Sequence, residues 1–318
     1  SGLIPEAASK MLAEHFDVVM HREMRLLTKE EILEGLAGKD ALLCLLSDNI
    51  DADIINANPQ LKVIANYGAG YNNIDVAAAS ARKIPVTNTP GVSTNATADL
   101  TIGLLIAIAR RIVEGDKNAR AGKFTGWAPL YHLGVDVTGK TLGIIGLGNI
   151  GKAVAKRARA FDMKVLYYSR TRLDPADERA LGVEYCPFTD LLARADFVSL
   201  HLSYSPAVHH MIGERELAIM KPTAFIINAA RGPIIDEAAL AAALERGIIA
   251  GAALDVYEFE PHITPALKKL DNVILCPHLG NATVETREAM AVMAAQNIIA
   301  ALTGKIPPNC VNAYIYEK

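Results

Sequence analysis

A glycine-rich turn near the middle of the chain constrains the fold more than any other feature. The turn, Gly146-Leu147-Gly148-Asn149-Ile150-Gly151, follows an apolar run at 141–145 and opens an Ala/Lys/Arg-rich stretch at 152–161. Its first glycine permits a sharp turn, its second lets a pyrophosphate approach the backbone, and its third lets the helix pack closely on the strand. A second strand-like run follows at 164–168. The pattern predicts a dinucleotide-binding strand, turn and helix, with a purely structural βαβ turn as the alternative.

Apolar runs of strand length alternate with helical stretches along almost the whole chain, which is typical of parallel α/β architecture. The 318 residues favour two domains. One helical pattern, 97–121, connects two α/β halves, and a second, from about Thr283 to Thr303, returns the chain to the first half. We therefore predict two Rossmann-like doubly wound parallel-sheet domains: a flavodoxin-like substrate (catalytic) domain of residues 1–97 and 285–318, and an NAD(P)-binding Rossmann domain of residues 98–284. The expected strands are 41–46, 63–66, 86–88, 141–145, 164–168, 197–202, 224–228, 252–256 and 273–276.

Charge and cysteine content exclude several classes of partner. A net charge of −3 is too close to neutral to suggest a surface for nucleic acid or membrane. The longest apolar run, 102–109, is too short to cross a bilayer, and the N-terminus lacks the layout of a signal peptide. The four cysteines, Cys44, Cys186, Cys276 and Cys310, are far apart and show no CxxC spacing. We expect reduced thiols, no metal site and a cytoplasmic protein.

Three segments with chemically active side chains follow predicted strands of the second half. They are Asn228 to Gly232, Leu254 to Pro261, and Cys276 to Gly280. In open parallel sheets, ligands bind beyond the carboxyl ends of the strands. An Arg, a Glu and a His are therefore expected to converge where the nicotinamide lies.

Those three residue types suit the reduction of a 2-oxo acid. An Arg can hold the carboxylate and polarise the carbonyl with its fixed fork of donors. A His can donate the proton that the carbonyl oxygen needs, and a carboxylate bonded to that His fixes its tautomer and keeps it protonated. Taken singly, each residue is more often a surface charge or a structural group, so the interpretation depends on their joint placement.

The other histidines have less specific interpretations. His201 ends a predicted strand, where it either lines the cofactor cleft or packs in the core. His209-His210 follow Ser205-Pro206 and are expected to start a surface helix, and His262 is expected to point to solvent.

Several motifs in the right order make the chain resemble the D-isomer-specific 2-hydroxyacid dehydrogenases, and most closely their glyoxylate/hydroxypyruvate reductase branch. The motifs that carry the resemblance are Asn66-Tyr67-Gly68-Ala69-Gly70-Tyr71-Asn72-Asn73-Ile74-Asp75, the 146–151 turn, Ala229-Ala230-Arg231-Gly232, Asp255-Val256-Tyr257 with Glu260-Pro261, and Pro277-His278.

The resemblance implies roles for individual residues. Arg231, Glu260 and His278 would be the catalytic set. The backbone N–H groups of Ala69 and Gly70 would hold the substrate carboxylate, which suits the anion affinity of a glycine-rich loop. Asp255 would contact the nicotinamide carboxamide, and Ala229 would also lie against the cofactor.

Cofactor preference is predicted from the residues after the second strand of the nucleotide unit, Ser169-Arg170-Thr171-Arg172. NAD sites usually have an acid here that accepts from the ribose 2′-OH, but no acid occurs before Asp174. A hydroxyl and two guanidinium groups suit a 2′-phosphate. We expect NADP(H) to be preferred, with NAD(H) also accepted if Arg170 only stacks on adenine and Arg172 is a solvated surface charge.

Substrate size and assembly are expected from two further segments. Leu45, Leu46 and Ser47 end a strand and suit a short, uncharged substituent, which favours glyoxylate and hydroxypyruvate. Trp127, the only Trp, has core packing as its simplest role. The resemblance implies instead that its segment lines the active site of a neighbouring subunit, in a homodimer formed around residues 97–140.

Other functions on the same fold stay open. One is a dehydrogenase for another D-2-hydroxy acid or for phosphite. Formate oxidation is disfavoured because formate dehydrogenases of this superfamily replace the Glu partner of the His, whereas Glu260 is present. A different class is a nucleotide-sensing transcriptional corepressor, because such relatives keep the catalytic set.

Overall fold

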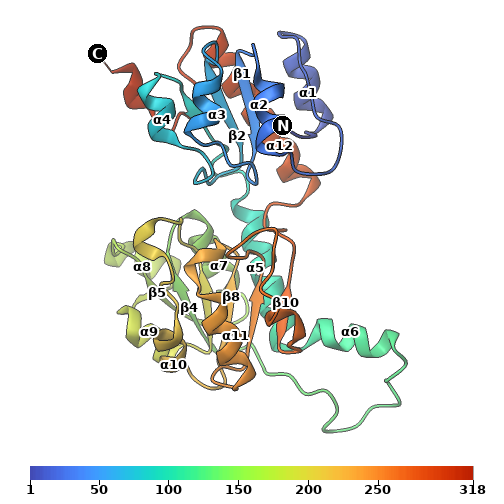
Figure 1. Cartoon of the computed structure of the whole chain (residues 1–318). Helices are drawn as coiled ribbons and strands as arrows, with labels where there is room; N and C mark the ends of the chain where they lie inside the picture. Colours follow the sequence, from blue (N-terminus) through green and yellow to red (C-terminus); the bar gives the residue numbers. More distant parts are fainter. Residues whose placement is uncertain (318) are drawn as a thin grey trace. The chain divides into compact units, whose positions relative to one another are not determined.

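The computed structural model of the chain describes residues 1–317 and divides into two compact units (Figure 1). Unit 1 comprises Ser1–Ser93 and Ala282–Lys318, and unit 2 comprises Thr94–Asn281. These limits lie within a few residues of the domain limits expected from the sequence. Each unit has a parallel sheet with helices on both faces, so the predicted α/β fold class is confirmed.

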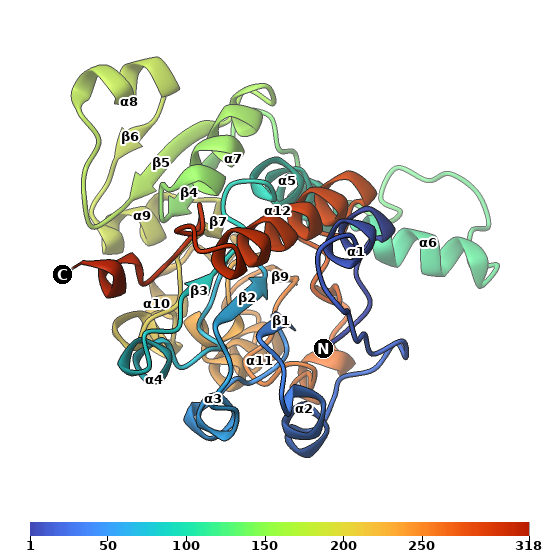
Figure 2. The ribbon, with the colours of Figure 1, turned by 90° about the horizontal axis from the view of Figure 1, so that it is seen from above.

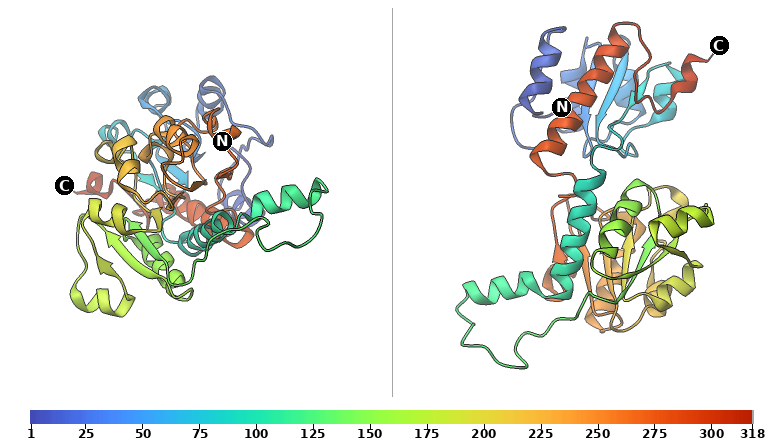
Figure 3. Two further views of the ribbon diagram at one scale, coloured as in Figure 1. Left: turned by 90° about the horizontal axis from the view of Figure 1, so that it is seen from below. Right: turned by 180° about the vertical axis from the view of Figure 1, so that it is seen from behind.

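Unit 1 has a three-stranded parallel sheet in the order β1-β2-β3. Its strands are β1 (Ala41–Leu45), β2 (Val63–Tyr67) and β3 (Val86–Thr87), and its α-helices are α1 (Glu6–Ala13), α2 (Lys29–Leu36), α3 (Ala52–Ala57), α4 (Val76–Ala81) and α12 (Val284–Leu302). Alternate residues of β2 enter two apolar clusters: Val63 and Ala65 pack with α1 and α12, and Ile64 packs with α2, α3 and α4. Figures 2 and 3 show α12 lying across the sheet beside α1.

Helix α12 begins and ends where the sequence predicts. Thr283 caps it, since its Oγ1 accepts from Thr286 N (3.1 Å). Gly304 lies just beyond the last turn with φ +78°, a left-handed conformation that glycine adopts without steric cost. The helix is tied to β2 by the Tyr67 hydroxyl, which donates to Arg287 O (2.6 Å).

Unit 2 has a seven-stranded sheet in the order β10-β9-β8-β7-β4-β5-β6, with every pair parallel. The strands are β4 (Thr141–Ile145), β5 (Lys164–Tyr168), β6 (Glu184–Tyr185), β7 (Phe197–Leu200), β8 (Phe225–Asn228), β9 (Gly251–Leu254) and β10 (Val273–Leu275). The strand order reverses between β4 and β7, which is the topological switch point of a doubly wound sheet. The short edge strand β6 was not predicted, because two residues leave no apolar pattern.

Helices cover both faces of the unit 2 sheet. They are α5 (Thr94–Ala109), α7 (Asn149–Arg159), α8 (Pro175–Leu181), α9 (Phe188–Arg194), α10 (Glu214–Ile219) and α11 (Glu237–Glu245), with α6 (Ile112–Arg120) beyond the sheet. Helices α5 and α7 share one apolar cluster with the sheet, and α9, α10 and α11 share the other.

The predicted single helix over 97–121 is wrong, because the chain breaks it into α5 and α6. Arg111 has φ +51°, outside the helical region. The Ala109 carbonyl accepts from Val135 N (2.8 Å) in place of a donor in the next helical turn. The apolar pattern also ends at Ala109, and α6 has no buried residue. Helix α6 and the chain that follows it therefore extend away from the rest of unit 2 before the chain returns at Val135 (Figures 1 and 3).

Candidate active site

Three loops that follow adjacent strands carry the residues expected to be catalytic. Arg231 follows β8, Glu260 lies beyond β9, and His278 follows β10. His278 Nδ1 lies 2.9 Å from Glu260 Oε2. Loss of water around its guanidinium lowers the pKa of Arg231, and the nearby charge of Glu260 acts in the opposite direction. The structure thus gathers these three side chains within unit 2.

Asn228, the last residue of β8, holds the turn that carries Arg231. Its Nδ2 donates to Arg231 O (2.9 Å), and its Oδ1 accepts from Ala230 N (3.0 Å). Gly232 lies so close to the next loop that a Cβ there would be 1.8 Å from the carbonyl carbon of Tyr257. The Arg231 turn therefore requires this glycine and is fixed against the loop that carries Glu260.

Both carboxylate oxygens of Glu260 have hydrogen-bond partners, which orient the side chain. Oε1 accepts from Tyr257 N (3.0 Å), which leaves Oε2 for His278. Burial alone would raise the pKa of the Glu260 carboxyl, but the hydrogen bond and charge of His278 outweigh it and the pKa is lowered. Because the carboxylate bonds Nδ1, Nε2 is the His278 nitrogen left to transfer a proton.

Asp255 anchors the loop that carries His278. Its Oδ1 accepts from Leu279 N (2.6 Å) and its Oδ2 from Gly280 N (2.7 Å). Burial raises the pKa of Asp255, although the two backbone N–H groups act in the opposite direction. His278 has φ +55°, a left-handed conformation that a non-glycine residue keeps only where its surroundings fix it. The sequence analysis did not predict that Asp255 anchors this loop, although an acid at the end of an apolar strand was a signal for it. The contact of Asp255 with a carboxamide stays a prediction.

The glycine turn has the shape that a pyrophosphate requires. Gly146 has φ +96°, and a Cβ at Gly151 would lie 2.2 Å from Gly146 O. A Cβ at Gly148 would meet no atom within 4 Å, so the backbone there faces open space. Helix α7 begins at Asn149 with no side-chain cap, and its first N–H groups suit an anion. These residues fit a dinucleotide.

Arg170 and Arg172, which the sequence predicts to suit a 2′-phosphate, have different surroundings in the loop after β5. Arg172 donates through Nε and Nη2 to Glu178 Oε1 (2.8 Å) and Oε2 (3.0 Å), and its guanidinium carbon lies 5.2 Å from the ring centroid of Tyr185. Arg170 and Thr171 are exposed, and Ser169 is half-buried. Arg172 is thus held by the protein's own carboxylate although it is exposed, whereas Arg170 has no carboxylate partner among residues 1–317.

Unit 1 contains the residues expected to meet the substrate carboxylate. Asn88 Nδ2 donates to Ala69 O (2.7 Å), and Asn66 Nδ2 donates to Gly70 O (2.5 Å). Within residues 1–317, neither the Ala69 nor the Gly70 N–H donates to a protein acceptor. Leu46 lies over the same loop, since a Cβ at Gly68 would be 2.2 Å from Leu46 Cδ2. Unit 1 by itself therefore places the expected loop and Leu46 side by side.

His201 lies at the glycine turn. Its carbonyl oxygen would be 2.7 Å from a Cβ at Gly146, and its Nε2 lies 2.8 Å from Ser199 Oγ. Burial lowers the pKa of His201 to about 4, so the ring is neutral near pH 7. His262 is exposed, as predicted.

The prediction that His209 and His210 start a helix is wrong. A short 3-10 helix, η1 (Pro206–Val208), ends at His209 instead, and His210 then has φ +49°. Because the left-handed conformation at His210 is incompatible with a right-handed helix, the chain turns away there.

Trp127 does not pack in a core. Its side chain is 83% exposed in a segment rich in exposed apolar residues. These residues are Ile112, Val113, Phe124, Trp127, Leu130, Tyr131, Leu133 and Val135. Its core-packing interpretation is therefore wrong, and its role at a subunit interface stays a prediction.

The four cysteines are free thiols, as expected. None of the helices formed by residues 1–317 combines the length and the apolar character needed to cross a membrane.

Comparisons with known proteins agree with this geometry. Residues 102–280 match the family profile of the D-isomer specific 2-hydroxyacid dehydrogenase, NAD binding domain. A putative 2-hydroxyacid dehydrogenase of Staphylococcus aureus is 53% identical over 312 residues, 98% of each chain. A glyoxylate reductase from Paecilomyes thermophila is 37% identical with TM-score 0.85, over 98% of this chain and 96% of that one. An NADPH-dependent glyoxylate/hydroxypyruvate reductase from Sinorhizobium meliloti, in complex with NADP and malonate, is 32% identical with TM-score 0.85, over 98% and 95%.

Proposed function

Because the chain belongs to the D-isomer-specific 2-hydroxyacid dehydrogenases, we propose that it reduces glyoxylate and hydroxypyruvate to the corresponding 2-hydroxy acids, with the D configuration at C2 of the hydroxypyruvate product. The observation that carries the proposal is the 2.9 Å bond between His278 Nδ1 and Glu260 Oε2, on loops adjacent to the Arg231 turn. The two reductases among the structural relatives support the substrate class.

The roles of the side chains follow from their contacts. A bound nicotinamide supplies a hydride to the substrate carbonyl carbon. His278 donates the proton that the carbonyl oxygen takes up, through the Nε2 that Glu260 leaves available. Glu260 holds the ring orientation and stabilises the protonated imidazole. Arg231 binds the substrate carboxylate and polarises the carbonyl with two parallel donors.

We propose NADP(H) as the preferred cofactor, with NAD(H) accepted less well. Ser169, Arg170 and Thr171 offer hydroxyls and a cation to a 2′-phosphate, and the loop has no acid to bind a ribose 2′-OH or to repel a phosphate. Since Arg172 is paired with Glu178, Arg170 would carry most of the preference. The relative that is NADPH-dependent supports this proposal.

The cofactor proposal has a matched test. Arg170→Ala should raise the KM for NADPH at least about tenfold, the loss of one charged phosphate contact, and leave the KM for NADH nearly unchanged. Arg172→Ala should raise the KM for NADPH less than Arg170→Ala does, because the Arg172 guanidinium already binds Glu178. A wild-type preference for NADH in kcat/KM would contradict the proposal.

For the substrate, we propose that the Ala69 and Gly70 N–H groups bind the carboxylate and that Leu46 limits the substituent to hydrogen or hydroxymethyl.

We also propose a homodimer in which the exposed apolar segment around Trp127 is covered by a second copy. A monomer by light scattering would contradict the homodimer.

Turnover tests the central proposal. The purified chain is mixed with glyoxylate, hydroxypyruvate, pyruvate or 2-ketogluconate, each with NADPH and with NADH, and loss of reduced cofactor is followed in the near ultraviolet. Glyoxylate and hydroxypyruvate with NADPH should give the highest kcat/KM. Tight nucleotide binding without turnover on any acid would overturn the proposal and favour a nucleotide sensor.

A further inference from the structure

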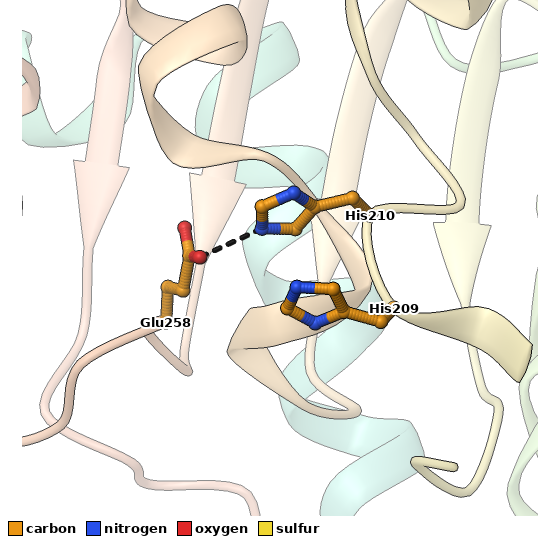
Figure 4. Close-up of side chains that lie close together, drawn as sticks. All are labelled: His209, His210 and Glu258. Atoms are coloured by element: carbon orange, nitrogen blue, oxygen red, sulfur yellow. Dashed lines mark hydrogen bonds and ion pairs between the residues drawn. The ribbon is translucent and has the colours of Figure 1, made fainter. Parts of the chain in front are cut away.

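A cluster of side chains of the types that can bind a metal ion lies on the same edge of the unit 2 sheet as the loops of Arg231, Glu260 and His278. His209 and His210 follow η1, in the loop after β7, and Glu258 lies in the loop after β9. Their candidate ligand atoms all lie within 4.8 Å of one another. Figure 4 shows both imidazole rings beside the Glu258 carboxylate. Nothing in the proposed reduction uses these three side chains.

The two rings have a fixed arrangement. Their centroids are 3.9 Å apart with planes at 19°, so the rings are stacked. His210 Nε2 lies 2.7 Å from Glu258 Oε1. His210 has a left-handed backbone, with φ +49°.

The Nδ1 atoms of both histidines face other polar groups. His209 Nδ1 lies 3.3 Å from the Tyr204 hydroxyl, and His210 Nδ1 lies 4.0 Å from Asp236 Oδ2. In metal sites, a histidine that binds through one nitrogen commonly directs the other to a carboxylate or another polar partner, which fixes the tautomer. This arrangement leaves both Nε2 atoms on the side of Glu258.

Glu258 is itself held in place. Its backbone N donates to Glu237 Oε1 (2.6 Å), and Glu237 Oε2 accepts from Thr264 Oγ1 (2.5 Å). The carboxylates of Glu258 and Asp236 lie 2.7 Å and 4.0 Å from the nitrogens of His210. The local charge therefore favours a cation.

We propose that His209, His210 and Glu258 bind a divalent transition-metal ion of the zinc, cobalt or nickel type. Two imidazoles and one carboxylate are a donor set that suits these ions better than Mg²⁺ or Ca²⁺, which favour oxygen ligands. Ligand bonds of about 2.0–2.2 Å put two ligand atoms on a tetrahedral ion about 3.4 Å apart. To admit the ion, the 2.7 Å separation of His210 Nε2 and Glu258 Oε1 must widen. The stacked His209 ring, whose ligand atom lies within 4.8 Å of the other two, must also turn toward the ion.

The ion links two loops that the backbone leaves separate. One is the loop after β7, and the other is the loop that also carries Glu260, two residues beyond Glu258. Binding should therefore raise the thermal stability of unit 2, since a ligand that binds only the folded state stabilises it.

Titration of the intact chain with metal alone tests the site. Zn²⁺ is followed by calorimetry, and Co²⁺ by its visible absorption, without substrate or cofactor, so the result does not depend on the proposed function. The wild type should bind one equivalent, with a rise in Tm. His209→Ala and Glu258→Gln should each weaken binding at least about tenfold. His209 is exposed, so its replacement should leave the fold intact.

Two control variants locate the ion. His262→Ala removes an exposed histidine from the loop that carries Glu258, and His278→Ala removes the histidine of the other His–Glu pair. Both variants should bind Co²⁺ as the wild type does. Absence of binding by the wild type overturns the proposal. So does equal affinity of His209→Ala and wild type, or loss of binding in either control variant.

Discussion

Two His–Glu pairs in unit 2 share one loop but use their rings differently. Glu258 bonds His210 at 2.7 Å, and Glu260 bonds His278 at 2.9 Å. Both histidines have a left-handed backbone, with φ +49° and +55°. His278 receives its carboxylate at Nδ1 and keeps Nε2 for other work, whereas His210 is bonded at Nε2 and has Asp236 near Nδ1.

The comparison shows that the engaged nitrogen, rather than the residue types, distinguishes the two pairs. A ring oriented through Nδ1 presents Nε2 to a substrate. A ring bracketed by carboxylates on both nitrogens is suited to holding two loops together or to binding a cation. The two glutamates are only two positions apart in sequence, yet they contact different nitrogens of their histidines.

Removing each histidine in turn should give the largest contrast. His278→Ala should lower kcat for glyoxylate reduction by roughly 10²–10⁴-fold, the usual loss when a general acid is removed. His210→Ala should lower kcat by less than about tenfold, since that ring transfers no proton. Steady-state kinetics with circular dichroism as a folding check measure both. Equal losses in the two variants would erase the distinction between the pairs.

A substitution at Gly232 should disturb the first pair through the backbone. An alanine Cβ would lie 1.8 Å from the carbonyl carbon of Tyr257, so either the Arg231 turn or the Glu260 loop must move. Gly232→Ala should cost about 1–3 kcal/mol or more of unfolding free energy, with a fall in kcat/KM.

The matched control is Gly103→Ala in α5. A Cβ there meets no atom within 4 Å, and alanine should stabilise the helix by up to about 1 kcal/mol. Denaturant unfolding of both variants measures the difference. A Gly232→Ala protein as stable as the wild type would show that the loops are not fixed against each other.

The sequence predicted the parts of this site that depend on local pattern. The 146–151 turn was predictable because strand, glycines and helix follow one another, and the sheet edge was predictable because β8, β9 and β10 end in Asn228, Leu254 and Leu275. The break at Arg111 was missed because the donor that replaces the helical bond, Val135 N, lies far along the chain. The pairing of Arg172 with Glu178 and the pairing of His210 with Glu258 were likewise missed, because they depend on contacts that spacing does not encode.

The pH dependence of reduction should respond to one glutamate and not to the other. The hydrogen bond and charge of His278 lower the pKa of Glu260 despite the opposing effect of burial. The wild-type rate should therefore fall with decreasing pH only below the ordinary range of a glutamate, as Glu260 takes up a proton, and in Glu260→Gln that fall should be absent from an already lower rate. Glu258→Gln should leave the position of that fall unchanged. Profiles of kcat/KM against pH compare the two variants with the wild type. The same change of profile in both variants would contradict the proposal that Glu260, and not Glu258, acts with the catalytic histidine.

The Arg172–Glu178 pair provides a reference acid in the same unit that contacts neither histidine. Hydrogen bonds from Arg172 and then from Tyr167 lower the pKa of Glu178 from 4.5 to about 2. Because the folded-state pKa lies below the unfolded one, the stabilisation is fully present above about pH 4.5 and is lost as the pH falls toward about 2. Glu178→Gln should therefore lower the Tm by a few degrees at neutral pH, and the difference from wild type should shrink steadily below about pH 4.5. Thermal unfolding across this range measures it. A difference that stays constant down to about pH 2 would show that Glu178 contributes through packing rather than charge.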